Sequence, residues 1–226
     1  MVERLKTRAV DVKKIYHRKQ RYRSIRGDTL WRSRDLALVI MISVLSLIYT
    51  TFVGQIGNII TGISSFNYLF TVGHAILISV ALLLYGGRRW RLLTQCVLVA
   101  ILFTPTYQGG SPFDLLSRLP IIVDAFFVDI VFNSVYGFFE KRNQLIWWAI
   151  LSVIIYCTTN PFYFMLNMYL FYPTEILIPF VNVAFFMLPV IFIESIIGGY
   201  LGYKIYERVK HVESNQIKKL LLRNPK

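Results

Sequence analysis

Long apolar stretches alternate with short polar breaks through most of the chain, and charged side chains are scarce between residues 36 and 203. An α-helix needs about 20 apolar residues to cross about 30 Å of hydrocarbon, whereas the strands of a membrane barrel are about 10 residues long and alternate in polarity. The stretches have helical length, so the sequence predicts an all-α, polytopic membrane bundle of six transmembrane helices. We expect these helices at about 36–53, 68–85, 92–107, 119–139, 145–169 and 176–203.

The positive charges indicate which side of this bundle faces the cytoplasm. Of the 25 Lys and Arg residues, all but Arg118 lie before the first helix, in the breaks at 88–91 and 141–142, or after the last helix. Short loops rich in Lys and Arg remain cytoplasmic. The pattern therefore predicts a multi-pass protein of the cell membrane with both termini in the cytoplasm. Arg118 then lies on the outer side.

The same charges divide the chain into a basic arm (1–34), the six-helix domain (35–207) and a basic tail (208–226). The net charge of +13 gathers at the edge of the membrane, where anionic lipid attracts each basic residue by about 1 kcal/mol. We therefore expect lipid headgroups, and not nucleic acid, as the partner of the arm. Its weak apolar stripe fits either an interfacial helix or a solvated segment that only sets the orientation. The polar stretch 54–67 is expected to dip into the membrane or to lie on it.

Polar side chains at similar depth on the last three helices form a candidate binding site. At a rise of about 1.5 Å per residue, Asp124 lies roughly 8 Å from the outer end of its helix. Such groups would be unsatisfied against lipid, so they line a substrate pocket or form hydrogen bonds that hold the helices together. Asp124 is expected to pair with a cationic group of the substrate or with Arg118. The candidate substrate-binding residues are Arg118, Asp124, Asn160, Tyr163, Asn167 and Asn182.

Two other ionisable residues within the predicted helices have structural interpretations. Glu194 is close to Gly198 and Gly202, whose spacing permits close approach of two helices. It is therefore expected to be packed and hydrogen-bonded at a subunit or helix contact. His74 has no second histidine at metal-ligand spacing, so we expect an interior histidine with satisfied hydrogen bonds.

The chain has no sequence motif of a catalytic or cofactor centre. HExxH, GxSxG and a phosphate-binding glycine-rich loop are absent from the sequence. Cys96 and Cys157 lie inside predicted helices without a CxxC pair, which argues against a disulfide framework or a thiolate metal site. A metal-dependent membrane enzyme would need several His or carboxylate ligands close together. The sequence therefore predicts no enzyme activity, no metal and no cofactor.

Three segments carry a resemblance to a known family. They are RDLALVI at 34–40, LYGGRR at 84–89 and, as the strongest match, IESIIGGYLG at 193–202. The chain resembles the membrane-embedded substrate-binding (S) components of energy-coupling factor (ECF) type vitamin transporters. That family implies a vitamin or precursor bound from outside, between the stretch after the first helix and helices four to six. It also implies a transmembrane coupling subunit and two ATPases as partners. The first helix departs from the family, because Ser43 and Ser46 replace paired small residues four apart.

Two functional hypotheses follow. The first is a substrate-binding component of a small-molecule uptake transporter, in which the asparagines and Tyr163 hydrogen-bond a polar heterocycle. The second is a non-catalytic accessory or structural subunit of a larger membrane complex, in which the basic arm docks a cytoplasmic partner.

Overall fold

The computed structural model describes residues 31–54, 56–61, 68–106 and 112–223. Most of the basic arm, much of the polar stretch 54–67 and the end of the basic tail lie outside these described residues. The chain divides into two compact units, Met1–Arg32 and Ser33–Lys226. All the elements named below belong to the second unit.

The secondary structure of the described residues is helical. Most of the long elements begin and end close to the predicted positions, because the apolar stretches are bounded by polar turns. The last helix is the exception, since it continues to Arg223, well past its expected end at residue 203. The elements are α2 (Ser33–Tyr49), a π-helical turn η1 (Thr50–Gly54), α3 (Ile56–Thr61), α4 (Thr71–Tyr85), α5 (Arg91–Phe103), a 3-10 turn η3 (Leu116–Arg118), α6 (Leu119–Lys141), α7 (Leu145–Phe171) and α8 (Thr174–Arg223).

Five segments of the described chain are helical, long and apolar enough to cross a membrane. They are Ser33–Gly54, Tyr68–Tyr85, Leu116–Lys141, Leu145–Phe171 and Leu177–Val212. The remaining apolar helix, α5, has 13 residues, which correspond to about 20 Å along its axis. The described residues thus form a helical bundle, as predicted, and its five long apolar helices are consistent with a multi-pass membrane protein, while the number of six spans and the orientation of the termini remain predictions.

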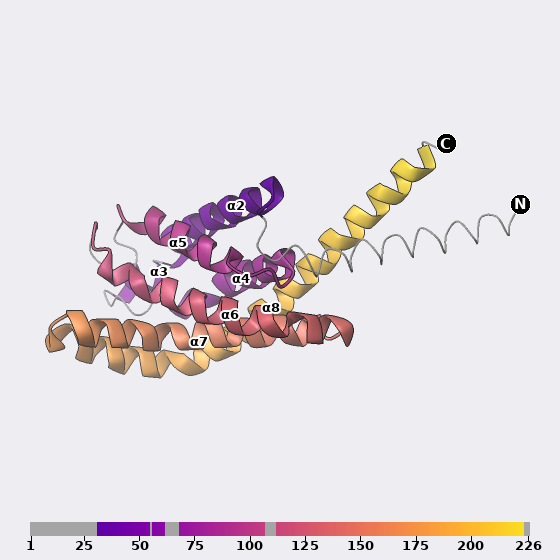
Figure 1. Ribbon diagram of the computed structural model, residues 1–226. Coiled ribbons are helices and arrows are strands. Elements are labelled where there is room, and N and C mark those ends of the chain that lie inside the picture. The colour runs from indigo at the N-terminus through magenta and orange to yellow at the C-terminus, as the bar shows by residue number, and fades with distance from the viewer. Residues whose placement is uncertain (1–30, 55, 62–67, 107–111, 224–226) are drawn as a thin grey trace, which may run out of the picture. The chain divides into compact units, whose positions relative to one another are not determined.

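The helices pack around a core in which α8 lies along α7 and α4, α6 lies along α7, and α5 lies between α2 and α6. Figure 1 shows α7 and α8 running side by side at the lower edge of the bundle. Trp148 and Ile191 are fully buried at the centre, with Ile78 and Leu92 from the other half of the bundle. The helix α8 has 50 residues, and its yellow end in Figure 1 continues past the other helices.

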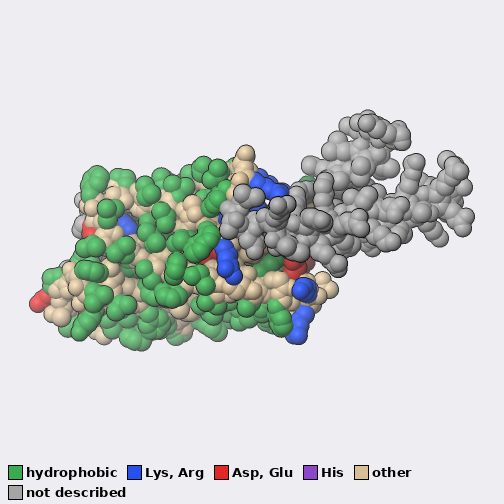
Figure 2. Space-filling model, in the orientation of Figure 1, with side chains coloured by type: hydrophobic (Ala, Val, Ile, Leu, Met, Phe, Trp, Pro, Cys, Tyr) green, Lys and Arg blue, Asp and Glu red, His purple; other side chains and the backbone are tan. Residues whose placement is uncertain are grey.

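Large apolar side chains cover the outside of this bundle. Phe52 is 72% exposed and Phe186 is 73% exposed, and many other Leu, Ile, Val and Phe side chains are similarly uncovered. Figure 2 shows hydrophobic side chains over most of the face in view. Monomeric water-soluble proteins rarely expose contiguous apolar surface on this scale. This surface matches the acyl chains of a bilayer.

Glycines of α8 allow its close approach to α4. A Cβ atom at Gly202 would lie 2.5 Å from the Cβ atom of Ser79, and one at Gly198 would lie 2.9 Å from the carbonyl oxygen of Val72. The Ser79 hydroxyl donates a hydrogen bond of 3.1 Å to the carbonyl oxygen of Gly199 across the same contact. The close helix approach expected from the glycine spacing is confirmed.

Candidate functional site

Two carboxylates inside the bundle accept hydrogen bonds at the N-terminal ends of other helices. Glu194 of α8 accepts a bond of 3.0 Å from the backbone N–H of Val72, in the first turn of α4. Asp129 of α6 accepts a bond of 3.0 Å from the backbone N–H of Leu93, in the first turn of α5. The first N–H groups of a helix lack intrahelical partners and carry its positive dipole end, so an acidic side chain stabilises them. The predicted role of Glu194 at a helix contact is confirmed.

Arg118 has the corresponding role at the C-terminal end of α5. Its guanidinium donates to the carbonyl oxygens of Phe103 and Thr106 at 3.4 and 2.9 Å, and to the hydroxyl of Ser117. Arg118 is 1% exposed. Carbonyl groups at the end of a helix lack partners, and a cation nearby stabilises them. Sequence reasoning placed Arg118 on the outer side as a candidate substrate-binding residue, and the structure buries it at this helix end.

Asp124 differs from these residues, because its partners are side chains of a neighbouring helix. The hydroxyl of Thr159 lies 2.8 Å from Asp124 Oδ1, and Asn160 Nδ2 donates to Asp124 Oδ2 at 3.3 Å. Both partners belong to α7, and Asp124 on α6 is fully buried. The predicted alternative in which Asp124 pairs with Arg118 is therefore wrong.

Asn160 extends this contact to a third helix segment. Its Oδ1 lies 3.5 Å from the hydroxyl of Tyr68, at the start of the apolar stretch that contains α4. The four residues Tyr68, Asp124, Thr159 and Asn160 are called the Asp124 cluster below. Pro161 follows Asn160 directly inside α7 and has no backbone N–H to continue the helical hydrogen bonds. The cluster thus lies where α7 lacks one backbone hydrogen-bond donor.

The Thr159 hydroxyl has two acceptors but one proton to donate. It lies 2.6 Å from the carbonyl oxygen of Ile155 in its own helix and 2.8 Å from Asp124. When the Thr159 hydroxyl donates its proton to the carbonyl oxygen of Ile155, its contact with Asp124 becomes a hydrogen bond only if the Asp124 carboxyl group is protonated and donates to the Thr159 oxygen. The cluster therefore accommodates Asp124 either ionised or protonated.

Aromatic and sulfur-bearing side chains from further helices lie next to the cluster. The hydroxyl of Tyr156, one turn before Thr159 and Asn160, lies 3.5 Å from the sulfur of Cys96. The ring of His74 lies 5.9 Å from the ring of Tyr156. His74 is an interior residue, as expected, but its buried Nδ1 has no hydrogen-bond partner among the described residues. The expectation that its hydrogen bonds are satisfied is thus wrong for this atom.

The remaining predicted site residues, Tyr163, Asn167 and Asn182, differ in their distance from the cluster and in their burial. Tyr163 lies near the cluster on α7, and its ring stacks on Phe127 of α6 at 6.0 Å between centroids. Asn167 is buried on α7, one turn further on. Asn182 of α8 has an exposed side chain. The structure brings Asp124 and Asn160 into direct contact, places Tyr163 nearby, and leaves Asn182 on the outer surface of the chain.

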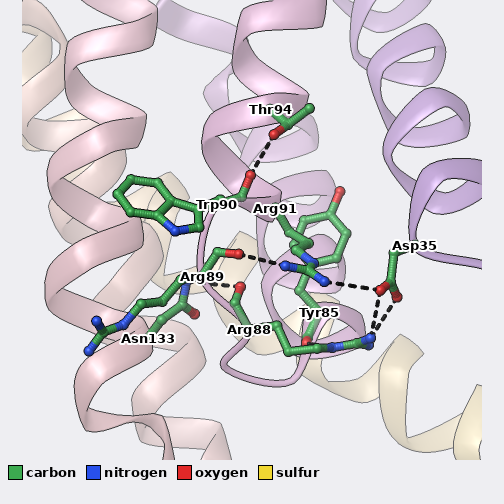
Figure 3. A network of polar contacts seen from close by, with 8 residues as sticks. All are labelled: Asp35, Tyr85, Arg88, Arg89, Trp90, Arg91, Thr94 and Asn133. Atoms are coloured by element: carbon green, nitrogen blue, oxygen red, sulfur yellow. Dashed lines mark hydrogen bonds and ion pairs between the residues drawn. The ribbon is translucent and has the colours of Figure 1, made fainter. Parts of the chain in front are cut away.

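Sequence reasoning missed an ion-pair cluster at another end of the bundle. Asp35 of α2 is 1% exposed and accepts from Arg88 at 2.6 and 2.8 Å and from Arg91 at 3.3 Å. Figure 3 shows the carboxylate of Asp35 facing both guanidinium groups, and Arg91 also donates to the carbonyl oxygen of Arg89 at 2.9 Å. The pattern of basic loops indicated orientation only. The signal for this cluster was the lone acidic residue at the start of the first helix, opposite a basic turn.

Comparison with known proteins gives no relative: no family matches the chain, and neither the curated proteins nor the solved structures contain a match. Among the described residues, no three His, Cys, Asp or Glu side chains are grouped as they would be around a metal ion. The function is therefore argued from the geometry of the Asp124 cluster.

Proposed function

We propose that this membrane protein is the substrate-binding component of a small-molecule uptake transporter of the cell membrane. In this proposal α5 completes a set of six spans, both termini are cytoplasmic, and a vitamin or vitamin precursor enters from the outside. The substrate contacts the Asp124 cluster between α4, α6 and α7. The protein performs no catalytic step itself.

One observation carries this proposal: the Asp124 cluster joins polar side chains from three apolar helix segments. Burying a polar group in an apolar environment without a partner costs several kcal/mol. Asp129, Glu194 and Arg118 offset this cost by stabilising helix ends. Asp124 and Asn160 have no such backbone role in the described structure, so binding a ligand is the function that best accounts for them.

The hydrogen bonds within the cluster are suited to exchange with a ligand. Asn160 to Asp124 measures 3.3 Å and Tyr68 to Asn160 measures 3.5 Å, whereas the most frequent N–H···O distance is about 2.9–3.0 Å and that of O–H···O is shorter. Long bonds of this kind are weak, so a substrate that offers better geometry can replace them at little cost.

The resemblance to ECF transporters supplies the proposed partners. A transmembrane coupling subunit and two ATPases would provide the energy, and anionic lipid would hold the basic arm and tail. Two small residues of α2, Ser43 and Ser46, are fully buried, and the Ser43 hydroxyl lies 3.2 Å from the carbonyl oxygen of Gln95 in α5. These serines therefore face the interior, and the coupling subunit would dock on another surface, for which the exposed Asn182 is a candidate.

The alternative function, an accessory or structural subunit of a larger membrane complex, has its own supporting observation. Asp129, Glu194 and Arg118 all serve the packing of the bundle itself. If the Asp124 cluster also only joins helices, the protein needs no ligand. The two functions differ in whether a small molecule accompanies the purified chain.

Native mass spectrometry on the chain, purified from its own membrane into lipid nanodiscs, tests the proposal. We expect a small-molecule adduct on the wild-type chain. The affinity for this molecule should fall at least about tenfold, equivalent to about 1.4 kcal/mol, in Asp124→Asn and Asn160→Ala. Ser134→Ala is a matched control, because Ser134 lies on the exposed side of α6 and its hydroxyl bonds the carbonyl oxygen of Ile130 in the same helix. A wild-type chain without an adduct would favour the structural subunit.

A further inference from the structure

The carboxylates of Asp35, Asp124 and Asp129, which are buried, and that of Glu194, which is half-buried, differ in how their negative charge is balanced. Asp35 faces the guanidinium groups of Arg88 and Arg91. Asp129 and Glu194 accept from the N-terminal N–H groups of helices, where the helix dipole corresponds to about half a positive charge. Each of these three carboxylates thus has positive charge of the protein next to it.

Among the residues that the structure describes, Asp124 has no such partner. The hydrogen-bond donors described for it, Thr159 and Asn160, are neutral. An ionised carboxylate without a positive partner is very costly in a low-dielectric interior. The Asp124 cluster is therefore short of one positive charge whenever its carboxyl group is ionised.

The basic residues of the membrane domain do not supply this charge. Between residues 33 and 203 the Lys and Arg residues are Arg34, Arg88, Arg89, Arg91, Arg118, Lys141 and Arg142. The one histidine of this range, His74, lies against the ring of Tyr156 and makes no described contact with Asp124. Of the seven Lys and Arg residues, all within the described part of the chain, none bonds Asp124. Six of them lie at the ends of α2, α4, α5 and α6, and Arg118 bonds the carbonyl groups at the end of α5. The segments 62–67 and 107–111, outside the described residues, contain no Lys, Arg or His in their sequence.

Aromatic rings flank the same cluster. Tyr68, whose hydroxyl contacts Asn160, has its ring 6.5 Å from that of Phe180 in an edge-on arrangement. The stacked pair Tyr163 and Phe127 lies three residues along α7 and α6 from Asn160 and Asp124, which makes these residues neighbours on their helices. Aromatic faces attract cations, and this attraction is stronger where water is excluded.

We infer that the ligand of the Asp124 cluster is an organic cation, whose positively charged nitrogen lies against the Asp124 carboxylate beside these rings. This inference rests on the proposed function and specifies its substrate class. A bare divalent metal ion does not fit, because Ca²⁺ and Mg²⁺ need about six or more oxygen ligands, and Asp124 is the one carboxylate of the cluster.

Matched pairs of charged and neutral ligands of the same shape test this inference. The first pair is choline and 3,3-dimethylbutan-1-ol, in which carbon replaces the charged nitrogen. The second is phenethylammonium and propylbenzene. Binding to the chain in lipid nanodiscs is measured by native mass spectrometry and by thermal stabilisation. The small-molecule fraction of the source membrane is screened in parallel, and its bound components are identified by mass.

We expect wild-type protein to bind the cation of at least one pair, or a cationic component of the native fraction, at least about tenfold more tightly than its neutral counterpart. Asp124→Asn should abolish this preference. Asp129→Asn, the same substitution on the same helix, should retain it, because Asp129 bonds the start of α5.

Two results would overturn the inference while leaving the proposed function intact. One is a bound ligand that is neutral or anionic, or a neutral isostere that binds as tightly as its cation, because Asp124 would then act as a protonated hydrogen-bond donor. The other is a charge preference that persists in Asp124→Asn. If no member of either pair and no component of the native fraction binds to wild-type protein, the proposed function itself fails.

Discussion

The polar residues of the described bundle have two kinds of partner. Arg118, Asp129 and Glu194 bond backbone groups at helix ends, where hydrogen-bonding capacity would otherwise remain unused. Asp124 and Asn160 bond each other across two helices. An acidic residue in a membrane helix therefore indicates a ligand site only after the nearby helix ends have been considered. By this criterion Asp124 is the candidate for ligand binding.

A surface carboxylate connects the segment before α6 to the end of α7. Asp114 accepts a hydrogen bond from the hydroxyl of Tyr172, and this bond is the largest cause of a lowered pKa of Asp114. The backbone N–H groups of Ser117 and Leu116 lower its pKa further. A lowered pKa in the folded state means that ionised Asp114 stabilises the fold above about pH 4, the ordinary range for Asp.

This stabilisation should be lost as the pH falls through the folded-state pKa of Asp114. We expect Asp114→Asn to lower the thermal unfolding temperature in detergent at pH 7, with the difference from wild type shrinking as the pH approaches 3. Tyr172→Phe should reproduce much of the effect, since it removes the strongest bond. An unfolding difference that stays constant between pH 7 and pH 3 would refute this role for Asp114.

At the level of single helices, residue spacing predicts the depth of a side chain and close helix contacts better than it predicts whether that side chain points into the bundle or outward. The depth estimate correctly placed Asp124 beside Asn160, because both positions follow from counting residues along a helix. It gave no information on rotation, so Asn182 was grouped with them although its side chain is exposed. A lone acidic residue and a basic turn were the signal for the ion pair between Asp35 and Arg88, but residue spacing along a helix does not show that these two distant segments meet.

The contact between α4 and α8 gives a prediction about helix packing. In Gly202→Ala the added methyl group would lie 2.5 Å from Ser79 Cβ and 3.0 Å from the carbonyl oxygen of Ile76. Overpacking of this kind typically costs about 1–3 kcal/mol. We therefore expect Gly202→Ala to lower the free energy of unfolding by that amount, measured by denaturant unfolding in detergent.

Gly137 of α6 is the matched control, because a Cβ atom there meets nothing within 4 Å. Gly137→Ala should leave the free energy of unfolding unchanged or raise it by up to about 1 kcal/mol, since alanine stabilises a helix interior relative to glycine. Equal effects of the two substitutions would contradict the close packing of α4 and α8.

At the scale of the molecule, the second unit is an apolar helical bundle, and charge is the signal for its orientation in the membrane. Basic residues at the start of α2, in the turn before α5, after α6 and along the end of α8 all favour one side. With α5 as a span, these four places lie together in the cytoplasm. If α5 does not cross the membrane, the turn before α5 and the turn after α6 lie on opposite sides of it. The basic residues would then no longer all lie on one side.

Single cysteines at exposed turns test this orientation. Phe113 is 76% exposed before η3, and Asn143 is exposed in the turn between α6 and α7. We expect a membrane-impermeant maleimide to label Phe113→Cys on intact cells and Asn143→Cys only after permeabilisation. The native Cys96 and Cys157 are buried, so background labelling should be low. Labelling of Asn143→Cys on intact cells would reverse the proposed orientation.

The central claim is that the Asp124 cluster binds a ligand. An experimental density map of the wild-type chain, purified from its native membrane without exchange of small molecules, tests it most directly. The account predicts non-protein density within hydrogen-bonding distance of the Asp124 carboxylate and in contact with Asn160. A map in which Tyr68, Thr159 and Asn160 pack closely around Asp124 with no additional density would contradict it.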